Sequence, residues 1–349
     1  MSFSYTASDL VPPFGSLSRC PPTLSVVVPC YNEEATLLPL VARLEQLSER
    51  LLARGLIVQP IELVLVDDGS HDHTWDVIKN AKTTFPVTGV KLSRNQGHQP
   101  ALFAGLMQAK GEAVVSMDAD LQDDPDAISE MVEAYLGGAD VVYGVRASRR
   151  SDTWFKRWTA QQYYDLLKRL GVDLLPDHAD FRLMSRKALK ALSQFGETHL
   201  FMRALVRKLG FPSEIVTYNR APRVAGDSKY TLRKMMELGF DGVTSFSVKP
   251  LRMIVFFGFT VAIVTFLFAL FAVISWVMGH TMPGWTSIVL PLSLLGGVHL
   301  VALGVIGEYV GKIYEETKRR PRFIIDEVMG ADSTMDGSRT CVQAIVRRT

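Results

Sequence analysis

The chain has 349 residues, with 38 Lys and Arg against 36 Asp and Glu, which gives a formal net charge of +2. This balance argues against nucleic acid as the partner, because domains that bind nucleic acid usually carry a strongly basic face. The three cysteines, Cys20, Cys30 and Cys341, are far apart and form no CxxC pair, so neither a disulfide framework nor a zinc site is indicated.

The N-terminal residues 1–22 are expected to form a flexible segment. They are rich in Pro, Ser and Gly and lack the basic and apolar regions of a secretory signal peptide. We therefore expect the catalytic part of the chain to stay in the cytoplasm.

Residues 23–146 alternate short apolar runs with segments of helical period. Together with the β-branched runs, this alternation is typical of an α/β fold in which helices cover both faces of a mostly parallel sheet. The predicted strands are 24–29, 61–68, 89–93, 113–118 and 140–144, and the predicted helices are 37–47, 74–81, 100–108 and 125–136. Ligands of such sheets bind beyond the carboxyl ends of the strands, which selects the segments 29–33, 67–70, 94–99 and 118–124.

The pattern changes after residue 146. Helices are predicted at 154–170, 185–194 and 199–209, and a strand at 213–219, so the catalytic domain is expected to cover residues 23–228. Residues 229–250 follow as an amphipathic helix, with Lys229, Arg233 and Lys234 on its polar side. Because it leads directly into an apolar segment, we expect it to lie in the membrane interface; the alternative is an ordinary surface helix.

Residues 253–307 contain no Asp, Glu, Lys or Arg. Two apolar segments, about 253–278 and 285–307, each reach the roughly 20 residues needed to cross a bilayer, so a transmembrane hairpin is predicted within residues 251–311. The alternative is a buried helical hairpin in a soluble protein. Basic residues flank both ends of the hairpin: Lys249, Arg252, Lys312, Lys318, Arg319, Arg320 and Arg322. The positive-inside rule then places the catalytic domain, both termini and a C-terminal tail, residues 312–349, in the cytoplasm.

The segment Asp118-Ala-Asp-Leu-Gln122 follows a predicted strand. In extended backbone, residues two apart point the same way, so two carboxylates and an amide oxygen can converge there. Hard oxygen ligands of this kind suit Mg²⁺ or Mn²⁺, which neutralises a diphosphate leaving group. The alternative is an acidic turn in which Asp123 and Asp124 cap the next helix.

Two more strand exits carry polar groups. In Val66-Asp-Asp-Gly-Ser70 a carboxylate can accept from a ribose hydroxyl or a base, or can cap the following helix. In Pro29-Cys-Tyr-Asn-Glu33, Tyr31 offers a face for stacking and Glu33 an acceptor. Each of these motifs is weak when taken alone.

Together, the motifs are similar to those of a known family. Val26-Val-Val-Pro-Cys-Tyr-Asn-Glu-Glu34, Val66-Asp-Asp-Gly-Ser70, Arg94-Asn-Gln-Gly-His-Gln-Pro-Ala-Leu102 and Asp118-Ala-Asp-Leu-Gln-Asp-Asp-Pro125 occur in this order. The chain thus resembles the family-2 glycosyltransferases of the nucleotide-diphospho-sugar transferase (GT-A) fold, and within them the polyprenyl-phosphate glycosyltransferases, such as dolichol-phosphate mannose synthase and the bactoprenol glucosyltransferases. The resemblance covers residues 24–323. It includes the hairpin and the segments Gly307-Glu-Tyr-Val-Gly-Lys-Ile-Tyr314 and Arg320-Pro-Arg322 that are typical of the bacterial branch.

The resemblance implies roles for individual residues. The nucleotide-sugar would contact Pro29, Tyr31, Glu33, Asp68, Asp118 and Ala119. Catalysis would involve Asp120, Arg146, Asp180 and Arg182, with Mg²⁺ or Mn²⁺ held by Asp120 and Gln122. The acceptor phosphate would contact Arg157, Arg223, Ser228 and Lys229. For these basic residues, solvated helix faces or contacts with lipid headgroups are the alternatives.

The resemblance implies metal-dependent, inverting transfer of a hexose from a nucleotide-diphospho-sugar to polyprenyl phosphate at the cytoplasmic membrane face, which is the inner membrane if the source is bacterial. UDP-glucose is the favoured donor, and a homo-oligomer is plausible by resemblance. One rival is a processive polysaccharide synthase. That class carries a Gln-x-x-Arg-Trp motif, whereas Trp154 here stands where the Gln belongs before Arg157-Trp158. The other rival is a membrane-anchored binding or scaffold protein with an inactive transferase domain, against which the intact acidic motif argues.

Overall fold

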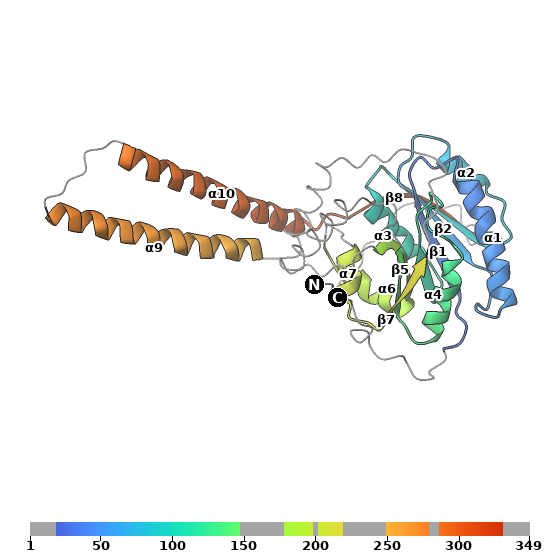
Figure 1. Cartoon of the computed structure of the whole chain (residues 1–349). Helices are drawn as coiled ribbons and strands as arrows, with labels where there is room; N and C mark the ends of the chain where they lie inside the picture. The colour runs from blue at the N-terminus through green and yellow to red at the C-terminus, as the bar shows by residue number, and fades with distance from the viewer. Residues whose placement is uncertain (1–18, 147–177, 198–201, 219–248, 279–285, 331–349) are drawn as a thin grey trace.

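The computed structural model describes residues 19–146, 178–197, 202–218, 249–278 and 286–330 (Figure 1). Within these ranges, eight strands form one sheet in the order β7-β5-β6-β4-β1-β2-β3-β8. The strands are β1 Leu24–Cys30, β2 Glu62–Asp67, β3 Val87–Leu92, β4 Ala113–Ser116, β5 Val141–Arg146, β6 His178–Ser185, β7 Ser213–Tyr218 and β8 Ile325–Met329.

The centre of the sheet is parallel. β1 pairs in parallel with β2 on one side and with β4 on the other, and β2 pairs in parallel with β3. β1, β2 and β4 are buried along their whole length, as expected for strands covered on both faces. The strands and helices predicted between residues 24 and 144 are confirmed, with ends that differ by a few residues.

Helices cover both faces of this sheet (Figure 1). Alternate residues of each strand point to opposite faces, so Val26 and Val28 join one apolar core while Val27 joins the other. The first core also contains side chains of α1 Leu37–Ala53, α2 Thr74–Asn80 and α4 Ala127–Leu136. The second contains side chains of α3 His98–Gln108, α6 Arg186–Ser193 and α7 Met202–Lys208.

Two strands were not predicted from the sequence. β6 lies between β4 and β5 and is antiparallel to both. Its segment, HADFRLMS, contains charged residues and no continuous apolar run, so the pattern does not indicate a buried strand. β8 lies in the segment expected to be a C-terminal tail and pairs antiparallel with β3 at the edge of the sheet.

Two long helices project from the sheet domain, α9 Lys249–Val277 and α10 Thr286–Thr317 (Figure 1). They contain the two segments predicted as membrane spans, and α10 continues ten residues beyond the second of them. Taking the described residues alone, we find no helix whose length and apolar content suffice to cross a membrane. The helix predicted at 154–170 and the amphipathic helix at 229–250 lie outside the described residues.

Candidate functional site

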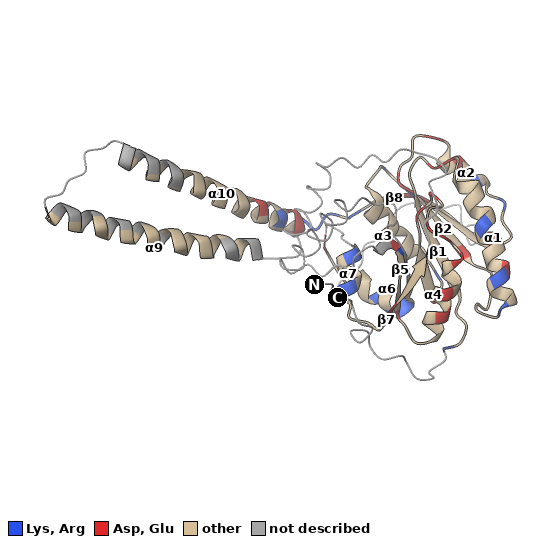
Figure 2. Cartoon of the chain, viewed as in Figure 1, with Lys and Arg blue, Asp and Glu red and all other residues tan. Residues whose placement is uncertain are grey.

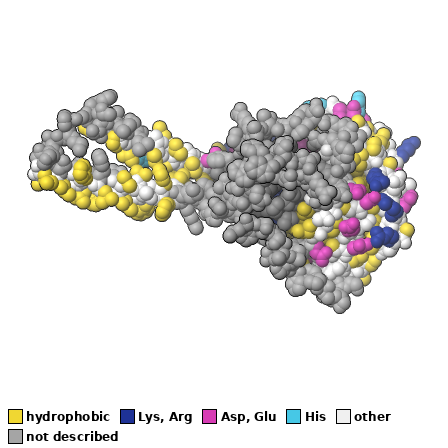
Figure 3. Space-filling model, in the orientation of Figure 1, with side chains coloured by type: hydrophobic (Ala, Val, Ile, Leu, Met, Phe, Trp, Pro, Cys, Tyr) yellow, Lys and Arg dark blue, Asp and Glu magenta, His cyan; other side chains and the backbone are white. Residues whose placement is uncertain are grey.

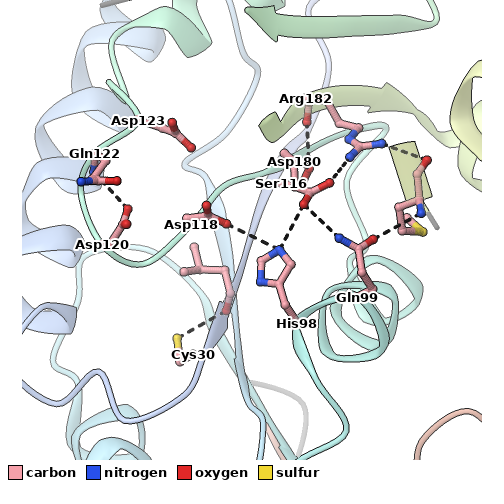
Figure 4. A network of polar contacts seen from close by, with 12 residues as sticks. Cys30, His98, Gln99, Ser116, Asp118, Asp120, Gln122, Asp123, Asp180 and Arg182 are labelled. Atoms are coloured by element: carbon pink, nitrogen blue, oxygen red, sulfur yellow. Dashed lines mark hydrogen bonds and ion pairs between the residues drawn. The ribbon is translucent and has the colours of Figure 1, made fainter. Parts of the chain in front are cut away.

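The candidate site lies where the carboxyl ends of β1, β2 and β4 meet the beginning of β6 (Figure 4). The antiparallel pairing of β4 with β6 places Ser116 opposite Arg182. Continuing the same register by two residues brings Asp118 and Asp180 to facing positions. The Ser116 hydroxyl donates to the Asp180 carbonyl at 2.5 Å, which fixes this junction.

The buried carboxylate of Asp180 joins four other side chains. Its Oδ2 accepts from Gln99 Nε2 at 2.9 Å and from Arg203 Nη2 at 3.3 Å, and lies 3.5 Å from His98 Nε2. Its Oδ1 accepts from Arg182 Nη2. Burial alone would raise the pKa of Asp180, but the hydrogen bond with His98 and the charges of Arg203 and Arg182 outweigh it and hold that pKa well below its usual range. Asp180 is therefore ionised, and it pairs with the cationic side chains of Arg182 and Arg203.

His98 is placed by a loop that Asp68 holds. The two carboxylate oxygens of Asp68 accept the backbone N–H groups of Gln96 at 2.8 Å and Gly97 at 2.9 Å. Gly97 has φ 94°, which turns the chain into α3, so that His98 begins the helix. Asp68 therefore builds the wall of the site, and burial raises its pKa although the two N–H groups oppose this.

The imidazole of His98 lies between two carboxylates. Its Nε2 is 3.6 Å from Asp118 Oδ1 and 3.5 Å from Asp180 Oδ2 (Figure 4). Burial lowers the pKa of His98, yet the hydrogen bond with Asp180 and the charge of Asp118 raise it further, so the net shift is upward. The two carboxylates therefore favour the protonated form of the His98 imidazole between them.

The acidic segment after β4 provides the oxygen atoms expected for a metal. Asp120 Oδ1 accepts from the Gln122 N–H at 3.2 Å, and Leu121 between them has φ 56°. Asp118 Oδ1 is buried and has no hydrogen-bond partner among the described residues. Burial raises the pKa of Asp118 to about 6, opposed by His98 and supported by Asp123, Asp180 and Asp120.

These observations fit a divalent cation, because a cation would relieve the crowding of carboxylates around an unsatisfied buried oxygen. Within the ranges described, no group of three or more His, Cys, Asp or Glu side chains could by itself hold a metal. Mg²⁺ in proteins is usually bound by one or two carboxylates and completed by substrate phosphates and water, and Asp120 and Gln122 are the residues here that could supply protein oxygens.

Asp123 and Asp124 play different parts. Asp124 Oδ1 accepts the N–H of Asp126 in the turn before α4, but the N-cap of that helix is Asp126, whose side chain makes no capping hydrogen bond. Asp123 is buried instead, and accepts from the Tyr218 hydroxyl at 2.5 Å. Arg146 Nη2 lies 4.0 Å from Asp123, at the end of β5, so the predicted arginine does reach the acidic segment.

The loops after β1 and β2 are joined by hydrogen bonds. The Asn32 side chain accepts the His71 N–H at 2.9 Å, and the Glu33 N–H donates to Thr74 Oγ1 at 2.9 Å. Tyr31 is 42% exposed and meets the His71 ring edge to face, which leaves ring surface for a ligand. The remaining predicted nucleotide-sugar contacts, Pro29 and Ala119, are buried in the same wall.

The structure thus brings together the predicted residues of β1, β2, β4, β5 and β6. Arg182 is fully buried, with Nη1 donating to the Met202 carbonyl at 3.2 Å, so it supports the site from behind. The predicted acceptor residues lie outside the described residues: Arg157, Arg223, Ser228 and Lys229.

Comparisons with known proteins agree with this geometry. Residues 25–193 match the family described as Glycosyl transferase family 2. The chain is 43% identical over 317 residues to the uncharacterized glycosyltransferase YkoT of Bacillus subtilis (strain 168), covering 89% of this chain and 93% of the relative.

The chain belongs to glycosyl transferase family 2.

This glycosyltransferase is also 37% identical over 305 residues to a protein named bactoprenol glucosyl transferase of Shigella phage SfV, covering 86% of this chain and 97% of that one. Among solved structures, the mannosyltransferase PcManGT of Pyrobaculum calidifontis, in complex with GDP-Man and Mn²⁺, is 21% identical with a TM-score of 0.45, over 66% of this chain and 64% of that one.

Three residues of the glycosyltransferase site were not singled out from the sequence. His98 and Gln99 belong to the Arg94–Leu102 motif, which by itself assigns them no role, and the sequence indicates for Arg203 only a place in a helix. The motif was the available signal for His98 and Gln99. For Arg203 there was none, because its contact with Asp180 joins segments that are distant in the chain.

Proposed function

We propose that this glycosyltransferase transfers a hexose, with glucose favoured, from a nucleotide-diphospho-sugar to a polyprenyl phosphate. The observation that carries the proposal is the extent of the similarity to bactoprenol glucosyl transferases. The alignment covers 86% of this chain, so it extends beyond strands β1 to β7 and reaches the segment of α9 and α10. A likeness that includes both the catalytic sheet and the apolar helices supports a lipid-linked acceptor.

The site supports a direct displacement. A phosphate monoester is largely anionic near pH 7, since its second pKa is about 6, so the acceptor oxygen needs no strong protein base. That oxygen forms the new bond to the anomeric carbon while the bond from this carbon to the donor diphosphate breaks, which inverts the anomeric centre. Asp180 is not the base, because its carboxylate already accepts from Gln99, Arg182 and Arg203.

The residues of this chain position the donor. The loops carrying Tyr31 and Glu33 would bind the nucleotide, and Arg146 would face the phosphates. A divalent ion held by Asp120 and Gln122, when bound, would neutralise the nucleoside diphosphate as it leaves. The His98 imidazole, which lies between Asp118 and Asp180, would keep these carboxylates together beside the donor.

The proposal includes a membrane hairpin formed by α9 and α10. Its support is the uncharged sequence of residues 253–307 together with exposed apolar side chains, including Phe256, which is 77% exposed (Figure 3). Figure 2 shows the charged residues of α10 at the end of that helix next to the sheet domain. Basic residues on both flanks favour a cytoplasmic sheet domain. The candidate site would then lie near the membrane surface, where the phosphate of a polyprenyl lipid is exposed.

The test is transfer of labelled sugar from several nucleotide-sugars into extractable undecaprenyl phosphate, with Mg²⁺ or Mn²⁺ and then with EDTA. We expect label in the lipid phase from one donor, UDP-glucose first, and its loss with EDTA. Asp120→Ala should abolish transfer in a folded protein. The matched control, Asp126→Ala, removes a half-exposed acid that pairs with Arg43 and should leave transfer unchanged. Near-normal turnover of Asp120→Ala would refute the metal assignment. No transfer from any donor by folded wild-type protein would refute the proposed reaction.

A further inference from the structure

After α10 the chain returns to the sheet that it left. β8 pairs antiparallel with β3, and the register places Lys91 opposite Glu327 and Leu92 opposite Ile325. One step further, the Ser93 N–H donates to the Ile324 carbonyl at 3.0 Å. The pairing therefore extends to the last residue before the Arg94–Gly97 loop.

Side chains add to this backbone pairing on the α2 side. Glu327 accepts from the Trp75 indole N–H at 3.2 Å and lies 3.0 Å from Lys79 Nζ. An ion pair at this exposed position is worth little alone. Together with the indole bond and the strand pairing, it attaches β8 to the sheet.

The two residues before Ile324 contact the helix that follows this loop. The Arg322 guanidinium lies 4.8 Å from the centre of the Phe103 ring, and its Nη2 donates to the Phe195 carbonyl. Phe323 packs against Phe103 with the ring centres 6.4 Å apart. Phe103 belongs to α3, the helix that begins with His98 and Gln99.

The Arg94–Gly97 loop is therefore held at three points. β8 holds its beginning through Ser93, Asp68 holds its middle through two N–H groups, and Arg322 with Phe323 hold the helix into which it leads. A helix moves as a rigid body, so displacement of Phe103 displaces the first turn as well. That turn carries the Gln99 amide, which bonds both Asp180 and the Met202 N–H.

We propose that Arg322 and Phe323 are positioning residues of the transfer reaction: they set the position of α3, so that His98 and Gln99 meet Asp180 in the site. The inference rests on the proposed function for its assay and on the proposed hairpin for its consequence. Because only residues 318–321 separate Arg322 from the end of α10, the same contact attaches the chain to the sheet domain soon after it leaves that helix. The chain segment that leaves the membrane helices thus reaches the catalytic cluster through one packed helix.

The first experiment tests the chain path without using activity. Lys91→Cys and Glu327→Cys are combined with Cys20→Ser and Cys341→Ser in the full-length protein, and then oxidised. Facing residues of antiparallel strands lie within the range of Cα separations that a disulfide bridges. We expect a disulfide within one chain. The two introduced thiols should be consumed on oxidation while the protein still runs as a monomer on a non-reducing gel. Failure to form it, or a cross-linked dimer, would overturn the proposal.

The second experiment compares neighbouring side chains. Phe323→Ala removes the ring on Phe103 and should lower kcat about 10- to 100-fold, the scale expected for misplaced catalytic groups. Ile324→Ala is the matched control, because that side chain is 58% exposed and its contact with Ser93 is made by the backbone. The control should keep wild-type kcat. Phe323→Leu, which retains apolar packing, should recover most of the loss.

A double-mutant cycle distinguishes positioning of the site through α3 from a purely structural role of Phe323. If Phe323 acts through α3, then adding Phe323→Ala to Gln99→Ala should lower kcat little further. Multiplicative losses, or equal losses for Phe323→Ala and Ile324→Ala, would overturn the proposal. If Phe323→Ala does not fold, Arg322→Gln replaces it in the same cycle. A wild-type protein that transfers no sugar would instead count against the proposed function, while the cross-link still tests the chain path.

Discussion

Asp180 and Arg182 stand two residues apart on β6, and in a strand such residues share one face. Their side chains pair in the interior, where Arg182 is fully buried. A buried ion pair does little for stability compared with an apolar pair, but removing one partner leaves the other charge uncompensated. This asymmetry makes the pair a sensitive test of the described geometry.

We predict that Asp180→Asn lowers the free energy of unfolding by about 3–5 kcal/mol, as expected for an unpaired buried charge. The measurement is urea denaturation of the detergent-solubilised protein. Asp126→Asn is the control, because this carboxylate pairs with Arg43 and Arg50 at a half-exposed position and should cost about 1 kcal/mol or less. Equal losses in the two variants would contradict the buried pairing.

His98 supplies the pH dependence of the same cluster. The folded state raises its pKa, since the contacts with Asp180 and Asp118 outweigh burial. A group with a raised pKa stabilises the fold fully below its ordinary value, and this contribution is lost as pH rises through the folded value. The pKa of Asp180 is depressed, so its contribution is present above its ordinary value and lost only in strong acid.

We therefore predict that His98→Gln destabilises the protein more at about pH 5.5, between the ordinary pKa values of Asp and His, than at about pH 9. Urea denaturation of wild type and variant at both values measures the difference. A stability difference that does not change with pH would show that His98 is neutral in the folded protein.

At the scale of elements, the site depends on how closely the loops after β2 and β3 approach. Gly69 has φ +66°, and a Cβ placed there would lie 2.5 Å from the Asn95 N atom. The backbone of the Arg94–Gly97 loop thus occupies the space that any other side chain would need. The sequence shows only that the loop after β2 contains a glycine. The structure gives the reason, because the loop after β3 lies against this glycine.

Gly55 offers a matched comparison for Gly69. Its φ is +65°, but a Cβ would meet nothing within 4 Å. Gly55→Ala should cost about 1 kcal/mol for the left-handed backbone alone. Gly69→Ala should cost about 1–3 kcal/mol more through overpacking, and should also lower transfer because the loop that places His98 shifts. Thermal unfolding and kcat of the two variants provide the check; similar values for both would show that the loops do not touch.

At the scale of the whole molecule, the segment between α10 and β8 connects α10 to the sheet domain. The apolar side chains of α9 and α10 are exposed away from the sheet (Figure 3). In water, apolar exposure of this extent would favour aggregation, whereas lipid or another apolar partner would cover it. In the proposed membrane hairpin, lipid would surround these side chains.

We predict that the loop between α9 and α10 faces the outside of the cell and the sheet domain the inside. Thr281→Cys, combined with Cys20→Ser and Cys341→Ser, should react with an impermeant maleimide in intact cells. The native Cys20, which is exposed on the sheet domain, should react only after permeabilisation in the Cys341→Ser protein. Labelling of Cys20 in intact cells, or of neither site, would contradict the orientation.

The sequence by itself determined the parallel core, the strand exits that carry the acidic segments, the uncharged stretch and the family resemblance. These are local properties: strand and helix periods extend over a few residues, and the motif at Asp118–Gln122 is contiguous. The described helices and strands up to residue 146 accordingly match the predicted ones.

Only the tertiary structure decided how distant segments meet. β6 pairs antiparallel with β4 on one side and with β5 on the other, an arrangement that depends on its neighbours and is not visible in its own charged sequence. This pairing brings Asp180 to His98 and Arg203. The tertiary structure also shows that Asp68, a predicted nucleotide contact, holds the loop after β3 through backbone hydrogen bonds. β8 returns to β3 from more than 200 residues away. Short-range patterns contain no record of such pairings, because backbone hydrogen bonds between strands form wherever an edge is available, whatever the separation in the chain.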